Sequence, residues 1–321
     1  MQNARIFRII LSYVLFLFIL IACSSSRLSI PVTRPAEINL KGFDKIAIGE
    51  IDGRGSRQLT DELTLALFKS KRFEVLDRQH LDAILKEHSL SLSGLVDEST
   101  AVEVGKLIGT AALIFGNITE YDYSEELTHR DETNKKTKKT IRKWQRKGTS
   151  KVTATLQVVD LATGKIIAIS KLEKAQSATK YSDVKRPAKV DKNALFSQCR
   201  ENIVRKFMRE IAPYTERVSV AFETDDKMPE LQQGYNMAKI GNWDEAIISF
   251  QTAVKKYKNG QLKVDKAYYN LGLGYMYTDR FTEARQNFEL AYKRKAEGKY
   301  EQAIKKLNRR IEEKRRLKEQ M

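Results

Sequence analysis

The sequence predicts a two-part protein, an α/β sandwich with a mixed sheet flanked by helices, followed by an all-α module. Two observations predict this architecture. Between residues 42 and 215, short β-rich runs alternate with segments whose apolar residues recur at helical spacing. From residue 229 onward the β-rich runs stop, and one helical pattern returns at a constant offset. A chain of 321 residues is long enough for two such domains.

Residues 1–22 have the pattern of a signal peptide. Arg5 and Arg8 precede an apolar run that is too short to span a bilayer, which takes about 20 residues. The run ends in Leu-Ile-Ala followed by Cys23 and Ser24. This ending resembles the bacterial lipobox, in which the cysteine is acylated by fatty chains such as palmitate and becomes the new N-terminus. The alternative is an ordinary secretory signal with a chance cysteine.

Acylation would attach the protein to a membrane without a spanning helix. Each buried CH₂ contributes about 0.8 kcal/mol, so two or more chains on Cys23 hold stably. Serine rather than aspartate after the cysteine resembles the pattern of lipoproteins sent on to the outer membrane. We therefore expect a bacterial outer-membrane protein that faces the periplasm. Residues 23–41, with three serines, Pro31 and Pro35, predict an extended tether.

Residues 42–215 predict the α/β domain. Its first helix has leucines at every fourth position from Leu59 to Leu67, an apolar stripe suited to packing on a sheet. The run from Ala111 to Ile118 is almost wholly apolar and predicts a strand buried on both faces. The further elements expected are strands at 43–49 and 73–76, helices around Leu81–Leu85 and Ala101–Ile108, a strand from Lys151, a tight turn at Asp160–Gly164, a returning strand at 165–170 and a closing helix at 193–211.

Five motifs in this region resemble the CsgG (CsgG/HfaB) family of curli production assembly and transport lipoproteins. They are R-F-E-V-L-D-R (72–78), L-x-x-I-L-x-E (81–87), L-S-x-S-G (90–94), G-K-L-I-G-x-x-x-L-I-x-G (105–116) and L-Q-V-V-D-L-A-T-G-K-I (156–166). The resemblance covers roughly residues 42–211 and implies a non-catalytic envelope lipoprotein.

Two insertions bear on whether the protein forms a channel. The resemblance implies that channel subunits carry membrane hairpins at positions corresponding to about 124–150 and 176–192. A membrane hairpin needs an apolar outer face, and a lysine or arginine at mid-bilayer costs about 2–4 kcal/mol. Both insertions are rich in lysine and arginine. We therefore expect no pore, and the first insertion to be a basic flexible loop or a long hairpin standing off the domain, as in non-channel relatives such as the activators of penicillin-binding proteins.

A helical repeat follows a linker at 216–228. Gly234, Met237, Gly241, Trp243, Ala246, Phe250 and Ala253 are matched 38 residues later by Gly272, Tyr275, Asp279, Phe281, Ala284, Phe288 and Ala291. The pattern resembles tetratricopeptide repeats, whose period is about 34 residues, with an insertion around Gly260. A reduced third unit with Gly298, Tyr300, Ala303 and Leu307 predicts a capping helix. Residues 229–321 thus form two repeats and a basic cap.

Tetratricopeptide repeats bind peptides in the groove that is lined by their first helices. Repeat phase assigns this groove to Tyr235, Lys239, Tyr269, Leu273 and Met276. The groove would receive other envelope proteins. The alternative is a packing module that rests on its own α/β domain or dimerises, because about three repeats are usually needed for independent stability. A homo-oligomer is left open.

The net charge of +17 is concentrated in two segments. Residues 133–151 contribute +9 and residues 293–321 contribute +7. Such patches indicate a solvated surface or a polyanionic partner, here anionic lipid or a cell-wall polymer. No nucleic-acid-binding motif accompanies them, and the expected location excludes nucleic acid.

Nothing in the sequence indicates a reaction centre, a metal site or a cofactor. The histidines His80, His88 and His129 lack a nucleophile or acid at catalytic spacing. Cys199 has no cysteine or histidine nearby at metal-ligand spacing. The glycines Gly53 and Gly55 precede a helix but match no phosphate-binding motif.

We therefore expect a non-catalytic scaffold or assembly factor in envelope biogenesis or secretion. One alternative is a subunit or accessory of a CsgG-type oligomeric secretion channel. Another is an activator of a cell-wall synthase.

Overall fold

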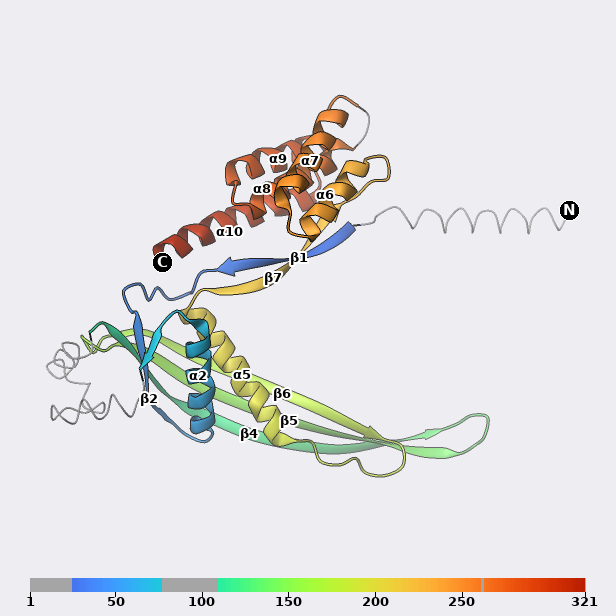
Figure 1. Cartoon of the computed structure of the whole chain (residues 1–321). Coiled ribbons are helices and arrows are strands. Elements are labelled where there is room, and N and C mark those ends of the chain that lie inside the picture. Colours follow the sequence, from blue (N-terminus) through green and yellow to red (C-terminus); the bar gives the residue numbers. More distant parts are fainter. Residues whose placement is uncertain (1–24, 77–108, 261–262, 321) are drawn as a thin grey trace. The chain divides into compact units, whose positions relative to one another are not determined.

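The computed structural model describes residues 25–76, 109–260 and 263–320 (Figure 1). It contains two compact units. The sheet unit comprises Pro35–Tyr214 with Glu319–Met321, and the helical unit comprises the chain up to Arg34 together with Thr215–Lys318. The signal peptide, Cys23 and the helices predicted between residues 77 and 108 lie outside the described residues.

The sheet unit is built on a five-stranded mixed sheet, as the sequence predicts. Its strands are β2 (Lys45–Asp52), β3 (Glu74–Leu76), β4 (Ala111–Thr133), β5 (Thr140–Asp160) and β6 (Ile166–Ser182), in the spatial order β3-β2-β4-β5-β6. Strand β2 runs parallel to both β3 and β4, whereas β4, β5 and β6 are antiparallel.

In the described residues of this unit, two helices pack on the sheet and complete its core with the strands. They are α2 (Ser56–Ser70) and α5 (Lys192–Ile211), and both pack against the sheet (Figure 1). The predicted leucine stripe from Leu59 to Leu67 is fully buried. Helix α5 begins at its cap Asp191, whose carboxylate accepts hydrogen bonds from the first backbone N–H groups.

Strands β4 and β5 extend well beyond the core as a long hairpin. They remain paired from Ala112↔Asp160 out to Thr133↔Thr140, and β6 accompanies β5 as far as Ser182. The side chain of Asn134 accepts hydrogen bonds from two backbone amides of the turn. Of the two alternatives for the basic insertion, the structure therefore has the long hairpin. The first part of the second insertion is its third strand.

Neither face of this three-stranded extension is apolar. Cross-strand register assigns the residues to the two faces, because directly paired residues share a face. One face carries Glu125, Leu127, His129, Asp131, Arg142, Trp144, Arg146 and Lys180. The other carries Glu126, Thr128, Arg130, Glu132, Ile141, Lys143, Gln145, Lys147 and Tyr181. Both faces thus mix charged side chains with a few aromatic ones.

The helical unit begins with a two-stranded sheet, which we term the ribbon. It consists of β1 (Ser25–Arg34) and β7 (Tyr214–Glu223). The prediction of a free tether at 23–41 is wrong for β1, and the predicted linker at 216–228 contains most of β7. The reason is burial: Ile30 and Val32 of β1, with Val220 and Phe222 of β7, belong to one hydrophobic core with the helices.

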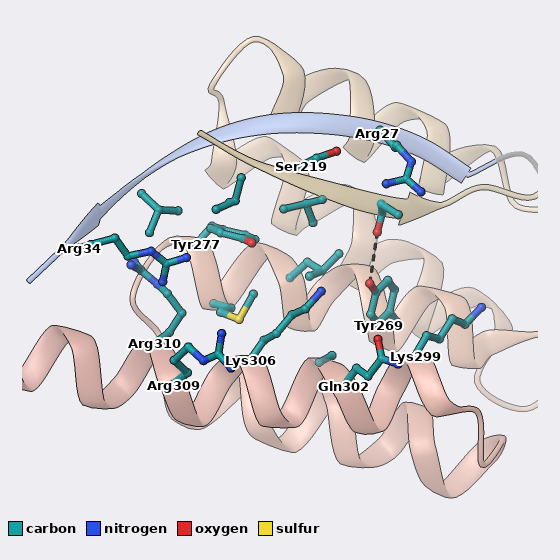
Figure 2. A pocket seen from close by; sticks show the side chains of 17 residues that line it. Arg27, Arg34, Ser219, Tyr269, Tyr277, Lys299, Gln302, Lys306, Arg309 and Arg310 are labelled. Atoms are coloured by element: carbon teal, nitrogen blue, oxygen red, sulfur yellow. Dashed lines mark hydrogen bonds between the residues drawn. The ribbon is translucent and has the colours of Figure 1, made fainter. Parts of the chain in front are cut away.

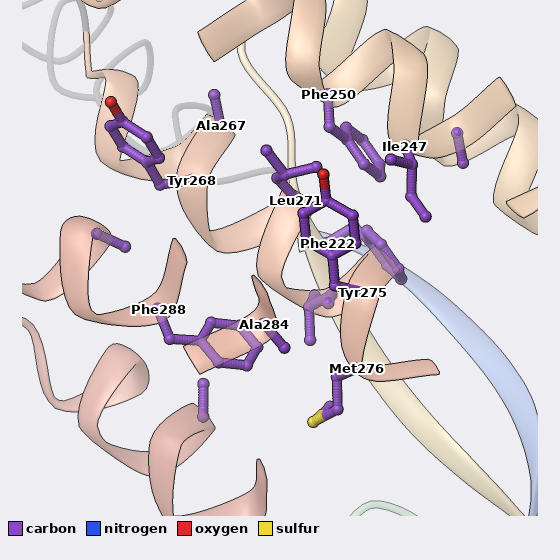
Figure 3. Packing of buried hydrophobic residues seen from close by; sticks show 14 of the residues in the cluster. Phe222, Ile247, Phe250, Ala267, Tyr268, Leu271, Tyr275, Met276, Ala284 and Phe288 are labelled. Atoms are coloured by element: carbon purple, nitrogen blue, oxygen red, sulfur yellow. The ribbon is translucent and has the colours of Figure 1, made fainter. Parts of the chain in front are cut away.

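Five helices lie in the described residues of this unit. They are α6 (Pro229–Lys239), α7 (Trp243–Tyr257), α8 (Val264–Tyr277), α9 (Phe281–Arg294) and α10 (Gly298–Gln320). Figure 3 shows how side chains from several helices converge with Phe222 in the core. Within the described ranges, no helix combines the length and the apolar character that crossing a bilayer requires.

The two helix pairs repeat one close contact. A Cβ added to Gly234 of α6 would lie 2.3 Å from the ring of Phe250 on α7. A Cβ added to Gly272 of α8 would lie 2.6 Å from the ring of Phe288 on α9. Each glycine therefore lets its helix approach an aromatic ring of the next helix, at the 38-residue offset found in the sequence. The tetratricopeptide assignment itself stays a prediction.

Candidate functional site

The predicted groove is divided by the ribbon. Tyr269, Leu273 and Met276 of α8 line one cleft together. Tyr235 of α6 lies elsewhere, and its hydroxyl donates to the backbone carbonyl of Arg27 on β1 at 3.1 Å. Lys239 is exposed near the end of α6 and does not line the cleft. The structure therefore brings three of the five predicted groove residues together, because the ribbon packs on the first helix pair.

The cleft has a volume of about 450 Å³ and three sides (Figure 2). The ribbon forms one wall, through residues of β1 and the consecutive β7 residues 218–221. Helix α8 forms the floor with Tyr269, Leu273, Met276 and Tyr277, and α10 forms the opposite wall. This volume is in the range of ligand-binding pockets, about 300–1,000 Å³.

The charge on the cleft lining is wholly positive. None of its seventeen lining residues is an aspartate or a glutamate. The cationic residues are Arg27 and Arg34 of β1 and Lys299, Lys306, Arg309 and Arg310 of α10. Figure 2 shows Lys306 reaching from α10 toward β7 across the middle of the cleft.

Some of these cations are neutralised by carboxylates just outside the cleft. Arg34 pairs with Glu216 at 2.9 Å and with Glu313. Burial alone would lower the pKa of Arg34, but the hydrogen bonds to both glutamates more than offset it, so that the pKa is raised. Lys299 pairs in the same way with Glu223 at 3.0 Å and Glu297 at 2.9 Å. These two residues are fixed in position by their partners.

Other cations of the cleft are not fully neutralised by carboxylates. Within the described part of the chain, Arg27, Lys306 and Arg309 take part in no ion pair. Arg310 contacts Asp279 only at 3.5 Å, and its Nε is buried without a hydrogen-bond partner. An arginine donor that is buried and unsatisfied costs free energy until an acceptor reaches it. The cleft is therefore suited to an anionic ligand.

The floor of the cleft is apolar, and its tyrosines stay neutral. Burial raises the pKa of both Tyr269 and Tyr277 to about 12. The Tyr269 hydroxyl donates to the backbone carbonyl of Ala221 at 3.3 Å, which fixes the ring against β7. The site thus combines cationic walls with an uncharged floor. None of its lining residues is a nucleophile placed beside a proton-accepting side chain.

The sequence pattern of α10 indicates the cleft residues that were not predicted. On α10, Tyr300, Ala303 and Leu307 are buried, and the lysines and arginines that line the cleft flank this stripe at helical spacing. Placing the lysines and arginines of residues 293–321 on the faces of an amphipathic helix, instead of only summing their charge, would have predicted the α10 wall of the cleft.

A second cluster of functional interest lies on the long hairpin. The rings of His129 and Trp144 are 4.8 Å apart, and the guanidinium of Arg186 lies 5.3 Å from the Trp144 ring. Nearby, Glu125 accepts hydrogen bonds from the Tyr123 hydroxyl at 2.8 Å and the Val190 amide at 3.1 Å, and pairs with Arg146.

These hydrogen bonds hold the pKa of Glu125 at about 2, with the Tyr123 hydroxyl as the largest cause. The ionised carboxylate thereby attaches the segment before α5 to the hairpin. Its position indicates a structural role.

The remaining candidates for chemistry show no site. Across the described ranges, no group of histidine, cysteine, aspartate and glutamate residues could hold a metal ion. Cys199 is buried, and burial raises the pKa of its thiol, which disfavours the reactive thiolate.

A family model described as "Curli production assembly/transport component CsgG" matches residues 40–205, just over half of the chain. The chain belongs to the CsgG family. The match coincides closely with the sheet unit, so the CsgG domain contains the mixed sheet, α2, the long hairpin and most of α5. The helical unit, with its cleft, lies outside the matched residues.

Solved structures similar to this CsgG-family chain include several lipoproteins. The LpoB C-terminal domain from Salmonella enterica is 14% identical, with 43% of this chain and 87% of that chain covered and a TM-score of 0.26. Lipoprotein GNA1162 from Neisseria meningitidis is 12% identical, covering 51% and 96%, with a TM-score of 0.28. The PelC dodecamer from Paraburkholderia phytofirmans is 10% identical, covering 58% and 99%, with a TM-score of 0.24.

These scores are too low to carry an inference about this chain. Among curated proteins, no sequence matches it.

Proposed function

We propose that this CsgG-family protein is an envelope lipoprotein that acts as a non-catalytic scaffold or assembly factor. Acylated Cys23 holds it at the outer membrane, facing the periplasm, and the helical unit recruits another envelope protein. The family assignment and the lipobox-like sequence at Cys23 support the location. The tetratricopeptide-like repeat supports the recruiting role.

One observation carries the interaction role. The helical unit encloses a cleft that is open to solvent, entirely cationic in charge and apolar at its base. Clefts that combine convergent polar groups with apolar surface are the usual form of a binding site. Several of its cations have no partner within the described residues, so the site is prepared for an external anion rather than closed by the chain itself.

The location is tested by fractionating cells that produce Cys23→Ala. We expect the variant to leave the membrane fraction, since it lacks the acylation site. Cys199→Ala is the matched control, because this thiol is buried in the sheet unit and should not affect fractionation. If Cys23→Ala sediments with membranes like the unaltered protein, the lipid anchor is wrong.

The scaffold role is tested by crosslinking in intact cells and purification from solubilised envelopes. We expect one envelope protein to be captured reproducibly, and capture to require the helical unit. If that protein is a cell-wall synthase, the activator alternative is favoured within the same framework. If the same partners are still captured after residues 229–321 are removed, the proposal is contradicted.

The channel alternative has one observation in its favour, the hairpin at the position where channel subunits carry theirs. The composition of that hairpin opposes it, since neither face offers an apolar band and each mid-bilayer lysine or arginine costs about 2–4 kcal/mol. Planar-bilayer conductance and negative-stain microscopy decide between the two. We expect no conductance, and we expect cysteines placed within residues 135–147 to react with a water-soluble reagent in cells.

A further inference from the structure

We propose that the cationic cleft binds an extended acidic peptide segment of a partner protein, which adds to β7 as a further strand. This inference rests on the proposed interaction function and specifies its ligand. Three features of the cleft support it: the edge of β7 that has no strand partner in the described residues, the spacing of the cations on α10 and the apolar floor.

The first feature is the backbone of β7. In the described residues this strand pairs only with β1, so its second edge has no strand partner. Along a strand, the N–H and C=O groups of alternate residues point to the same edge. The carbonyl of Ala221 accepts from Tyr269, and Glu223 exchanges two hydrogen bonds with the Asn270 side chain, at 2.9 and 2.8 Å. Side chains of α8 thus already bind this edge as a neighbouring strand would.

The same alternation directs the backbone of Ser219 toward the cleft. Ser219 lies two residues before Ala221 and is itself a lining residue. Its N–H and C=O therefore point to the edge that α8 occupies further along. An extended peptide placed there would continue the hydrogen bonding that Asn270 begins. This is the geometry of strand addition, in which main-chain hydrogen bonds give affinity and alternate side chains give specificity.

The second feature is the spacing of charge on the opposite wall. Lys306 and Arg310 lie four residues apart on one side of α10, which is about 6 Å along its axis. Alternate side chains of a strand are about 6.6 Å apart, because each residue advances about 3.3 Å. Acidic side chains at alternate positions of the peptide would therefore match Lys306 and Arg310, whereas Lys299 lies about two turns, roughly 10 Å, before Lys306. From Lys299 to Arg310 the helix advances about 16 Å, which corresponds to about five residues of strand.

The third feature is the floor, where Leu273 and Met276 are buried between the walls. Free phosphate or a lipid headgroup would use the cations but neither the strand edge nor this apolar surface. An acidic peptide with intervening apolar residues uses all three. The observations therefore favour a peptide over a phosphate, and the experiment includes the phosphate-bearing lipid as a competing outcome.

The test measures binding of the peptide fluorescein-Glu-Val-Glu-Val-Glu-amide, labelled at its N-terminal amine, to the full chain in detergent by fluorescence anisotropy. We expect saturable binding, and none with glutamines in place of the glutamates. The double variant Lys306→Glu with Arg309→Glu should bind at least tenfold more weakly. Both residues are exposed, so the change leaves the core intact, and an unchanged melting curve verifies this.

The matched control reverses two charges on the same helix outside the cleft. Lys305→Glu with Lys318→Glu makes the same change in net charge at exposed positions, and should bind the peptide as the unaltered protein does. Equal loss in both double variants would mean that net charge alone attracts the peptide, and would overturn the proposal.

The backbone contribution is tested with N-methylated peptides. Methylating alternate amides on one edge of the peptide removes the donors that face β7, and should weaken binding at least tenfold. Methylating the amides of the other edge should leave binding unchanged. Equal affinity for both peptides would exclude strand addition.

Binding of lipid by the cleft is tested with vesicles of phosphatidylcholine, with and without phosphatidylglycerol, and a Cys23→Ala protein. Binding to the anionic vesicles that disappears in the Lys306→Glu, Arg309→Glu background, together with no peptide binding, would assign the cleft to lipid and overturn the proposal. Failure here is distinct from failure of the scaffold role. If the cleft variant captures a partner in cells as well as the unaltered protein does, the scaffold role is kept. Only the cleft is then rejected as the binding site for that partner.

Discussion

Replacing Phe222 by alanine tests whether the ribbon is an integral part of the helical unit. Phe222 of β7 is fully buried, and its ring lies 6.0 Å from the ring of Phe250 and 5.9 Å from that of Tyr235. Truncating a buried phenylalanine costs about 3–5 kcal/mol, and aromatic pairs of this kind add about 0.5–1.5 kcal/mol beyond burial. We expect a loss in the upper half of that range for Phe222→Ala.

The assay is hydrogen exchange followed by mass spectrometry on the full chain. It is preferred to a single denaturation curve, because a protein of two units does not unfold in one step. A loss of about 4 kcal/mol would accelerate exchange roughly a thousandfold in peptides of β1, β7, α6 and α7, with about 1.4 kcal/mol for each factor of ten. Peptides of the sheet unit should be unaffected. Thr215→Ala, an exposed position of the same strand, is the control and should change stability by less than about 0.5 kcal/mol.

The reasoning is refuted if β1 and β7 exchange rapidly in the unaltered protein. It is also refuted if Phe222→Ala leaves the exchange of α6 and α7 unchanged. The first result would mean that residues 25–34 behave as a tether, and the second that Phe222 does not join the ribbon to the first helix pair.

Three further substitutions test single contacts. In Gly234→Ala the new methyl group meets the buried ring of Phe250, so strain of about 1–3 kcal/mol exceeds the helix-propensity gain of about 1 kcal/mol, and thermal unfolding should show a net loss. Tyr300→Phe removes the hydroxyl that donates to the buried Asp265 carboxylate at 2.6 Å, which should cost about 1–3 kcal/mol. Glu125→Gln should accelerate exchange of the Val190 amide at neutral pH, and in the unaltered protein this protection should fall as the pH drops from about 4.5 toward 2.

The direction of the last effect follows from the depressed pKa. Folding stabilises the ionised form of Glu125, so its contribution is complete above the ordinary pKa and is lost as acid protonates the folded state. Protection that is constant from pH 5 to about 2 would contradict it. The controls are Gly298→Ala, Tyr292→Phe and Glu126→Gln, which alter an open glycine and exposed side chains. Each should leave its measurement unchanged.

Local pattern predicted most of the sheet unit. The leucine stripe of α2 and the closing helix were visible because the residues that define them are neighbours in sequence. The turn at Asp160–Gly164 was visible for the same reason. In the structure the amide of Gly164 donates to the carbonyl of Asp160 at 2.8 Å, with Gly164 at φ 66°. That positive φ is where glycine is favoured.

The ribbon could not be predicted in this way. Leu28, Ile30 and Val32 do alternate as in a strand, but Pro31 between them indicated a tether, since proline lacks an amide donor. A two-stranded ribbon consists only of edge strands, where proline is tolerated. The partner strand is also distant, as the ion pair from Arg34 to Glu216 spans 182 residues. Local sequence contains no information about such a pairing.

For the candidate site, the sequence could place residues only relative to their own repeat. Repeat phase put Tyr269, Leu273 and Met276 on one surface of α8, and all three line the cleft, because phase is a property of neighbouring residues. It misplaced Tyr235, since the ribbon occupies the surface of α6 that the repeat alone would leave open. The positive walls come from β1 and α10, which meet only in the folded unit.

The start of β1 at Ser25 has a consequence for the proposed lipid anchor at Cys23. A free leash of some 19 residues would let it sample a radius on the order of 25 Å. With the ribbon formed, only Ser24 separates an acylated Cys23 from a folded strand, and each extended residue spans at most about 3.6 Å. If Cys23 is acylated as we propose, the folded strand would thus begin within a few ångströms of the lipid surface, and partners of the helical unit would meet it close to that surface.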